Sequence, residues 1–86
     1  MPTLIAFHEV KDVDAWLAAK TREEFFGPHG ITARPFTDPG GSNRVGLIIE
    51  TPDIVTFEEA MLTEGAAESM EQDGVIAETL FVLAEA

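Results

Sequence analysis

The stretch from Thr3 to Val10 is apolar on both of its faces if it forms a β-strand. Alternate side chains of a strand point to opposite sides, so Ile5 and Phe7 share one face while Ala6 and His8 share the other. A sheet that is apolar on both sides needs a cover on both sides. Because the chain has enough helix for one cover only, we expect a second copy of the chain to supply the other.

The pattern of caps, turns and apolar periodicity predicts four strands and two helical stretches. Pro35 cannot donate a ladder hydrogen bond, which places its strand at a sheet edge or at a bulge. The expected elements are strand Thr3 to Val10, a helix from Val13 to Phe26, strands Ile31 to Asp38 and Arg44 to Thr51, a helix that Asp53 caps and that breaks around Thr63 to Gly65, and strand Val75 to Glu85.

The order β-α-β-β-α-β predicts a ferredoxin-like α+β fold. We expect one domain over residues 1–86, with a four-stranded antiparallel sheet and both helices on one face. The other face would be a large exposed apolar patch, which monomers avoid. Two such sheets paired face to face would close an α+β barrel, so a homodimer is predicted.

Size and charge narrow the function classes. A chain of 86 residues is close to the size at which a single core is only marginally stabilising, and without cysteine it has no disulfide to add. Sixteen acidic residues against five basic ones give a formal charge of −11, which disfavours nucleic acid and anionic membranes as partners. With no targeting segment in the sequence, we expect a cytoplasmic protein.

The sequence offers no pattern typical of a bound metal or cofactor. His8 and His29 lack the paired spacing of metal ligands, and there is no cysteine to join them. Gly40 and Gly41 lie in a hairpin turn that opens no helix, which is not the context of a phosphate-binding loop. We therefore expect no metal and no cofactor.

His8 is the candidate catalytic residue. A neutral imidazole can act as acid, base or polar anchor near neutral pH, and the small side chain of Ala6 on the same face leaves room for a ligand. The alternative is a structural histidine that is hydrogen-bonded to a neighbour. The sequence does not fix which sheet face His8 occupies, and this assignment separates the two interpretations.

Four further residues are candidate ligand contacts, each with a simpler alternative. Trp16 forms either a pocket wall or a core anchor, and His29 lies either at a pocket rim or in a solvated turn. Arg34 and Arg44 could hold a substrate carboxylate or enolate oxygen, or could pair with surface carboxylates.

Lys20 and Glu24 lie on the apolar stripe of the first predicted helix, at positions where apolar residues are expected. Either the helix stops packing near Lys20, or these charges face a polar pocket.

Several segments together resemble small stand-alone dimeric α+β barrel proteins. These segments are His8 to Trp16, Arg22 to Pro28, Ser42 to Leu47, Pro52 with Asp53, Met70, and Asp73 to Val75. The wider superfamily resembled here includes antibiotic-biosynthesis-monooxygenase-like proteins, haem-degrading enzymes, isomerases, cyclases and stress-response barrels. The resemblance implies a ligand pocket between the sheet and the helices.

These observations predict a homodimer that binds a small apolar or aromatic molecule beneath its helices. If the protein is an enzyme, the resemblance implies a cofactor-independent monooxygenase, isomerase or cyclase, with His8 moving a proton and Arg34 or Arg44 stabilising an oxyanion. The alternative is a noncatalytic ligand-binding or stress-response barrel.

Overall fold

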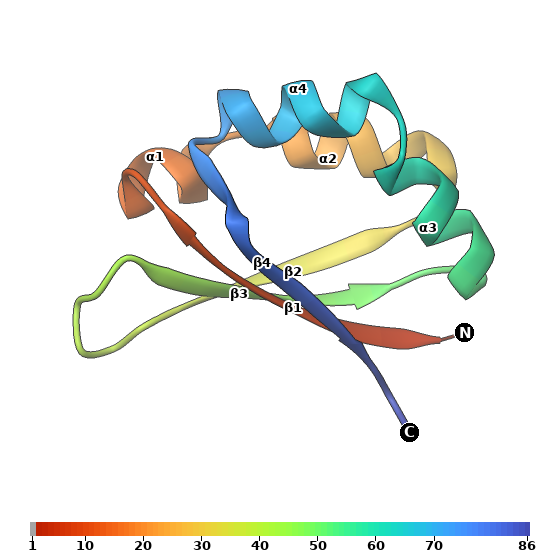
Figure 1. Cartoon of the computed structure of the whole chain (residues 1–86), viewed down its shortest axis with the longest axis horizontal. Helices are drawn as coiled ribbons and strands as arrows, with labels where there is room; N and C mark the ends of the chain where they lie inside the picture. The colour runs from red at the N-terminus through yellow and green to blue at the C-terminus, as the bar shows by residue number, and fades with distance from the viewer. Residues whose placement is uncertain (1) are drawn as a thin grey trace.

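The computed structural model describes residues 2–86 of the chain (Figure 1). In chain order its elements are β1 (Thr3–Val10), α1 (Val13–Ala18), α2 (Thr21–Phe26), the short 3₁₀ helix η1 (Gly27–His29), β2 (Thr32–Thr37), β3 (Arg44–Glu50), α3 (Ile54–Met61), α4 (Glu64–Gln72) and β4 (Val75–Ala84). No helix within residues 2–86 has the length and apolar character needed to cross a membrane.

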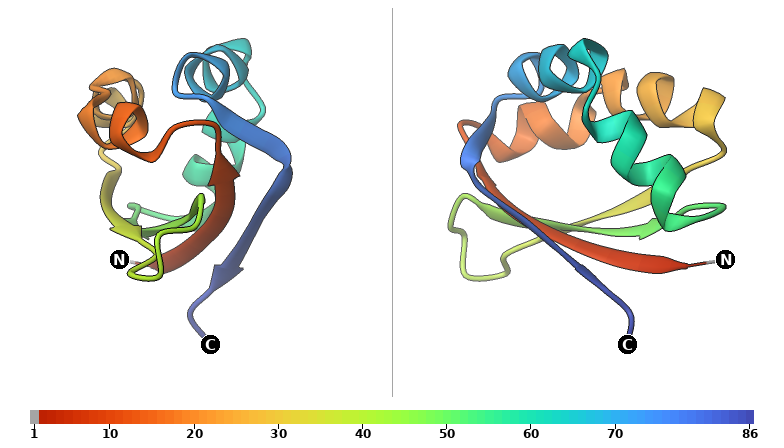
Figure 2. Two further views of the ribbon diagram at one scale, coloured as in Figure 1. Left: turned by 90° about the vertical axis from the view of Figure 1, so that its left-hand side faces the viewer. Right: turned by 45° about the vertical axis from the view of Figure 1, so that its right-hand side comes forward.

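The four strands form one antiparallel sheet in the order β2-β3-β1-β4. All the helices lie on one face of this sheet, as both views in Figure 2 show. The predicted ferredoxin-like arrangement is therefore confirmed. Pro35 lies in β2, which is an edge strand, so its missing N–H leaves no gap in the interior of the sheet.

The central strand β1 has the two apolar faces that its sequence predicts. Leu4, Ala6, His8 and Val10 point toward the helices and are all buried. Phe7 points to the other side and is 37 % exposed. The structure thus assigns His8 to the face that the helices cover.

The single helix predicted from Val13 to Phe26 is wrong, because Ala19 interrupts it. Ala19 has extended backbone angles (φ −67°, ψ 136°), so α1 ends before it and α2 begins afresh at Thr21. The break resets the 3.6-residue periodicity, so that Arg22 takes a buried position while Lys20 and Glu24 are exposed. Packing therefore pauses near Lys20 and resumes in α2 with Arg22 and Phe26, so neither interpretation of Lys20 and Glu24 describes the helix fully.

The predicted break in the second helical stretch is confirmed, although the new helix starts slightly earlier than expected. The Asp53 carboxylate caps α3 by accepting the backbone N–H of Thr56 at 2.6 Å. The Thr63 hydroxyl then caps α4 by accepting the N–H of Ala66 at 3.2 Å. Each side chain satisfies a donor that the first turn of its helix would otherwise leave unpaired.

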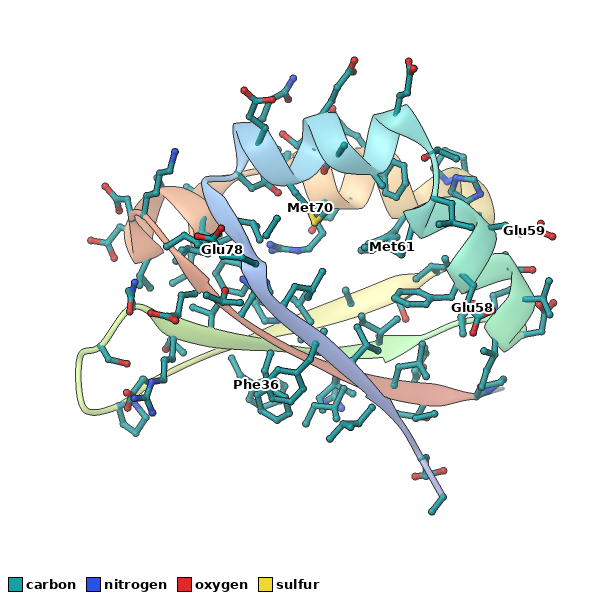
Figure 3. All side chains as sticks on the ribbon, in the orientation of Figure 1. Phe36, Glu58, Glu59, Met61, Met70 and Glu78 are labelled. Carbon is teal, nitrogen blue, oxygen red and sulfur yellow. The ribbon has the colours of Figure 1, made fainter. Side chains whose placement is uncertain are left out.

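The sheet face away from the helices carries an apolar surface, which we call the open face. Phe36, Gly46, Phe7 and Phe81 lie in register across all four strands, with the rings of Phe7 and Phe81 5.2 Å apart. Figure 3 shows Phe36 pointing away from the helices. The open face consists of Ile5, Phe7, Phe36, Ile48, Phe81 and Leu83.

Gly46 lies between Phe7 and Phe36 in this row and adds no side chain between them. A Cβ at this position would lie 3.3 Å from the Ala6 carbonyl oxygen, and within 4.0 Å of both Phe7 and Phe36 side-chain atoms. Phe36 and Phe81 remain 50 % and 55 % exposed within one chain. A monomer would leave this aromatic row in water.

Candidate functional site

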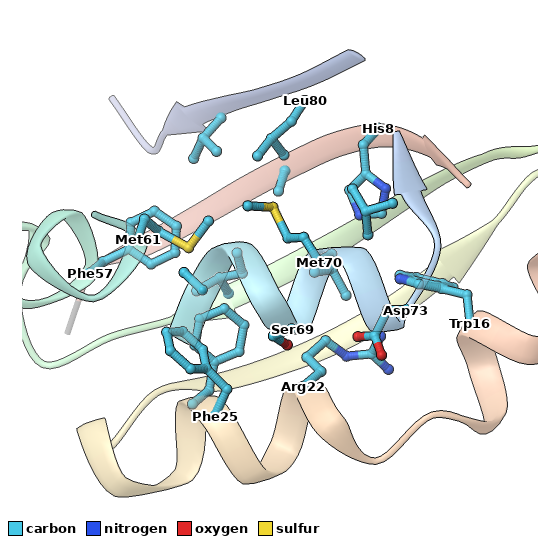
Figure 4. Close-up of a pocket in the computed structure, with 17 residues that line it drawn as sticks. His8, Trp16, Arg22, Phe25, Phe57, Met61, Ser69, Met70, Asp73 and Leu80 are labelled. Atoms are coloured by element: carbon cyan, nitrogen blue, oxygen red, sulfur yellow. The ribbon is translucent and has the colours of Figure 1, made fainter. Parts of the chain in front are cut away.

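A cavity lies between the helix-facing side of the sheet and the helices (Figure 4). Strands β1, β3 and β4 line one side of it, and all four α-helices contribute to the other. Its volume, taken as the space open to the centre of a water-sized sphere, is about 60 Å³. By that measure one water needs about 10–15 Å³, so the cavity has room for several waters or a small organic group.

Most of the cavity lining is apolar. Its aromatic side chains are Trp16, Phe25, Phe26 and Phe57. The flexible side chain of Met61 also faces the cavity, and flexible thioethers adapt to ligands of different shape. Such a lining favours a flat, apolar or aromatic molecule.

His8 projects from β1 into this cavity and is 6 % exposed. Its ring meets Trp16 edge to face, with centroids 5.6 Å apart, and its Nδ1 lies 3.4 Å from the Glu9 carbonyl oxygen. Burial lowers the pKa of His8 below 6.5, the Glu9 contact partly opposes this, and the charge of Arg22 lowers the pKa further. His8 is therefore a neutral imidazole at neutral pH, the form that can accept a proton.

Arg22 reaches the same end of the cavity from α2. Its guanidinium carbon lies 4.7 Å from the centroid of the Trp16 ring, a cation–π contact. The side chain is 8 % exposed, and its Nη1 is buried without a hydrogen-bond partner among the described residues. Burial lowers the pKa of Arg22, yet a guanidinium remains protonated in proteins.

Asp73 approaches this end from the C-terminus of α4, where it is the cap residue. It is also 8 % exposed, and its Oδ1 has no hydrogen-bond partner within residues 2–86. Burial raises the pKa of Asp73, and the nearby Arg22 charge only partly offsets this effect. Burying a carboxylate oxygen without a hydrogen-bond partner is unfavourable, because nothing replaces the hydrogen bonds that it makes to water.

Figure 4 shows that the cavity has a polar end and an apolar end. His8, Arg22 and Asp73 gather around Trp16, while Phe25 and Phe57 lie toward the opposite end. We call His8, Arg22 and Asp73 the polar cluster. The cluster combines a neutral proton acceptor, a fixed cation and a carboxylate in a site largely shielded from water.

The structure brings together two of the five residues singled out from the sequence. His8 and Trp16 meet in the cavity, whereas the exposed His29 packs beside Phe25 with ring centroids 5.5 Å apart and does not line it. Arg34 and Arg44 are exposed, opposite Ile48 and Glu9 in register, on the face away from the cavity. Within one chain, neither arginine reaches the polar cluster.

Sequence reasoning missed Arg22 and Asp73 as site residues. Arg22 was hidden because a continuous helix from Val13 turns it away from the apolar stripe. Once a helix starts at Thr21, Arg22 shares a face with Phe25 and Phe26 at the i, i+3 and i+4 spacing. Asp73 directly precedes a glycine turn, and no sequence signal distinguishes it from an ordinary end of a helix.

Comparison with known proteins places the fold but not the activity. No protein-family model matches the sequence, and no curated protein matches it either. Solved structures do match over almost the whole chain. One is an antibiotic biosynthesis monooxygenase, with a TM-score of 0.65 and 15 % identity over 100 % of this chain and 97 % of that one.

Two further structures carry the same description on a provisional basis. The Bordetella bronchiseptica protein has a TM-score of 0.74 and 17 % identity, over 99 % of this chain and 94 % of that one. The Deinococcus radiodurans protein has a TM-score of 0.59 and 8 % identity, over 100 % of this chain and 91 % of that one. The resemblance in fold found from the sequence is thus confirmed, and such low identities say nothing more.

Proposed function

We propose that this protein binds a small, largely apolar aromatic molecule in the cavity and oxygenates it without a cofactor. The observation that carries the proposal is the polar cluster, a buried neutral imidazole beside a fixed cation at one end of an aromatic-lined cavity. The description of the structural neighbours as antibiotic biosynthesis monooxygenases supports the same reaction class.

His8 would act as the general base on a phenolic or enolic hydroxyl. Removing that proton makes the ring electron-rich enough to react with dioxygen, which is the oxidant. One ring C–H becomes C=O, and the second oxygen atom leaves as water, so a phenol gives a quinone. A general base of this kind contributes about 10²–10⁴-fold to the rate.

Arg22 would stabilise the phenolate oxygen that forms as His8 takes the proton. The guanidinium carries a permanent charge, and the surrounding apolar lining strengthens its electrostatic effect. Sequence reasoning proposed Arg34 or Arg44 for this task. Arg22 is the better candidate because it lines the cavity that contains His8.

The test compares His8→Ala with His29→Ala. Each purified protein is incubated with a panel of naphthols and hydroquinones while oxygen uptake and quinone absorbance are recorded. We expect His8→Ala to lose at least about 100-fold in rate and His29→Ala to keep the wild-type rate, since His29 lies outside the cavity.

The alternative is a noncatalytic binding protein, and the same samples test it. If no phenol in the panel is consumed, but naphthols still bind with equal affinity to the wild type and to His29→Ala, the oxygenase proposal fails and the binding proposal stands. A His8→Ala variant that loses stability without any change in ligand binding would assign His8 a structural task through its contact with Trp16.

We further propose that residues 1–86 act as one domain and that the protein is a homodimer joined through the open face. The support is the register of Phe36, Gly46, Phe7 and Phe81, which aligns three exposed aromatic rings from β2, β1 and β4 across the sheet. Burying this row against an identical row would remove it from water and close a shared core.

A further inference from the structure

We propose that Arg22 and Asp73 act as a specificity-determining pair that admits neutral hydrogen-bonding groups and rejects carboxylates. This inference rests on the proposed function only in that the cavity must bind a small aromatic molecule. The ligand class is then an aromatic ring bearing a group that both accepts and donates a hydrogen bond, such as a primary carboxamide or a hydroxyl.

The first argument comes from two buried atoms without partners. Arg22 Nη1 is a donor and Asp73 Oδ1 is an acceptor, and each belongs to a side chain that is 8 % exposed and lines the cavity. An unpaired buried polar atom is costly, so native proteins satisfy nearly all of them. A bound group with one acceptor and one donor would satisfy both atoms at once.

When no ligand is bound, water can satisfy these atoms, since the cavity has room for it. A ligand gains affinity by displacing such water only when it reproduces the lost hydrogen bonds. A purely apolar molecule would leave Arg22 Nη1 and Asp73 Oδ1 unpaired. The pair therefore disfavours plain hydrocarbons as well as ligands with only one kind of hydrogen-bonding atom.

The second argument comes from the charges that face this end of the cavity. Arg22 is a cation and Asp73 is a carboxylate, while His8 is neutral because burial lowers its pKa. The three groups sum to zero net charge. A ligand carboxylate would be attracted by Arg22 but repelled by Asp73, and a buried charge without net compensation is strongly disfavoured.

The lining orients the ligand relative to this pair. Phe25 and Phe57 lie toward the apolar end and Trp16 lies against Arg22 (Figure 4), so a ring held at the apolar end would direct its polar substituent toward Arg22 and Asp73. The aromatic lining binds any flat ring of suitable size. Discrimination between substituents therefore falls to Arg22 and Asp73.

Three probes of matched shape test this selectivity. Benzamide, benzoate and toluene are titrated into the wild-type protein at pH 7.5, and dissociation constants are measured by NMR. We expect benzamide to bind at least about tenfold more tightly than benzoate and more tightly than toluene, the scale of a charge-assisted hydrogen bond. Benzoate binding as tightly as benzamide would overturn the inference.

Asp73→Asn provides the sharper test, because it removes the repulsion without changing the shape of the side chain. The polar cluster then carries a net positive charge, so we expect benzoate to gain about tenfold or more and to overtake benzamide. Glu71→Gln is the matched control, since it removes one carboxylate from an exposed position on the same helix. The control should leave the wild-type order of affinities unchanged.

Arg22→Gln tests the pair from its other member and serves if Asp73→Asn does not fold. We expect it to weaken benzamide about tenfold, while Lys20→Gln, which removes an exposed cation at the start of α2, has no effect. If neither variant folds, the wild-type order of benzamide and benzoate decides the question by itself.

Failure of the proposed function would look different from failure of this inference. If none of the three probes binds, the cavity does not take aromatic ligands, and both proposals fall. If toluene and benzamide bind equally well and Asp73→Asn changes neither, the cavity binds aromatic rings but Arg22 and Asp73 only contact each other, so the inference alone is wrong.

Discussion

The two faces of the sheet are similarly apolar in sequence but have different surroundings. From β1, the helix-covered face packs Leu4, Ala6 and Val10 into the core together with the polar His8. The open face presents Phe7, Phe36 and Phe81 to solvent. One strand therefore contributes to two apolar surfaces, of which only one is closed within the chain.

The two faces also differ in the kind of observation that supports a proposal about them. On the open face, the exposed apolar row is the observation on which the proposed homodimer rests. On the covered face, the unpaired atoms of Arg22 and Asp73 are the observation on which the proposed ligand selectivity rests. Apolar exposure marks a candidate interface, and polar atoms without partners mark a candidate binding site.

The largest expected effect comes from truncating the covered face. Phe26 is 8 % exposed, and its ring centroid lies 6.4 Å from that of Phe57. We expect Phe26→Ala to lower the free energy of unfolding by about 3–5 kcal/mol, as cavity-forming substitutions of phenylalanine do. Urea unfolding measures the loss. Phe36→Ala is the matching change on the open face, and the unfolding free energy that it loses should depend on protein concentration. If the losses of both variants were independent of concentration, the two faces would not differ as proposed.

Placing a charge on the open face should have the next largest effect. We expect Phe81→Glu to weaken the dimer by about 10²–10³-fold, because a carboxylate would have to be desolvated at the interface. Light scattering over a concentration series measures this change. Val55→Glu, at a 60 % exposed position on α3, is the matched control and should leave the dimer intact. A wild-type protein that is a folded monomer at micromolar concentration would refute the interface altogether.

Acidification should affect the covered face at a smaller scale. The folded pKa of His8 lies below its ordinary value of 6.5, so the unfolded chain binds the proton more readily. Stability is therefore lost as the pH falls below about 6.5, by up to about 1.4 kcal/mol for each pH unit.

Asp73 has a raised pKa and contributes the opposite slope at pH values above 3.8, so the two effects must be separated. Melting temperatures of the wild type and of His8→Asn, compared from pH 7.5 to 5.5, isolate the contribution of His8. If the two proteins respond equally, the imidazole does not titrate in this range.

The smallest expected effect is that of Gly46→Ala, which perturbs the open face from within the sheet. The new methyl group would lie 3.3 Å from the Ala6 carbonyl oxygen and close to Phe7 and Phe36. We expect a loss of about 1 kcal/mol in unfolding free energy, because the Ala6 carbonyl must give way, and a further weakening of the dimer as strand β3 shifts beneath Phe7 and Phe36. Analytical ultracentrifugation and thermal unfolding measure the two effects; an unchanged dimer would show that the ring positions do not control it.

Much of the fold could be predicted from the sequence, because alternation along the strands and caps such as Asp53 are local signals. His8 and Trp16 could be identified as candidates for the same reason, since each stands out on its own element. Arg22 could not, because its burial depends on the break at Ala19, and the local sequence there has neither glycine nor proline to mark it. Arg34 and Arg44 were chosen for their chemistry, but their sheet face depends on register.

The break between α1 and α2 offers a way to change which ligands the cavity accepts. Because Ala19 breaks the helix, α2 sets its own periodicity, and the side chain that faces the cavity depends on where α2 begins in the sequence. If the α2 backbone kept its place, adding or deleting one residue at this junction would shift the sequence along it by one position. A deletion would bring Glu23 to the position of Arg22, and an insertion would bring Thr21 there. A change in segment length, without any substitution, would thus exchange a cation in the cavity for an anion or a hydroxyl.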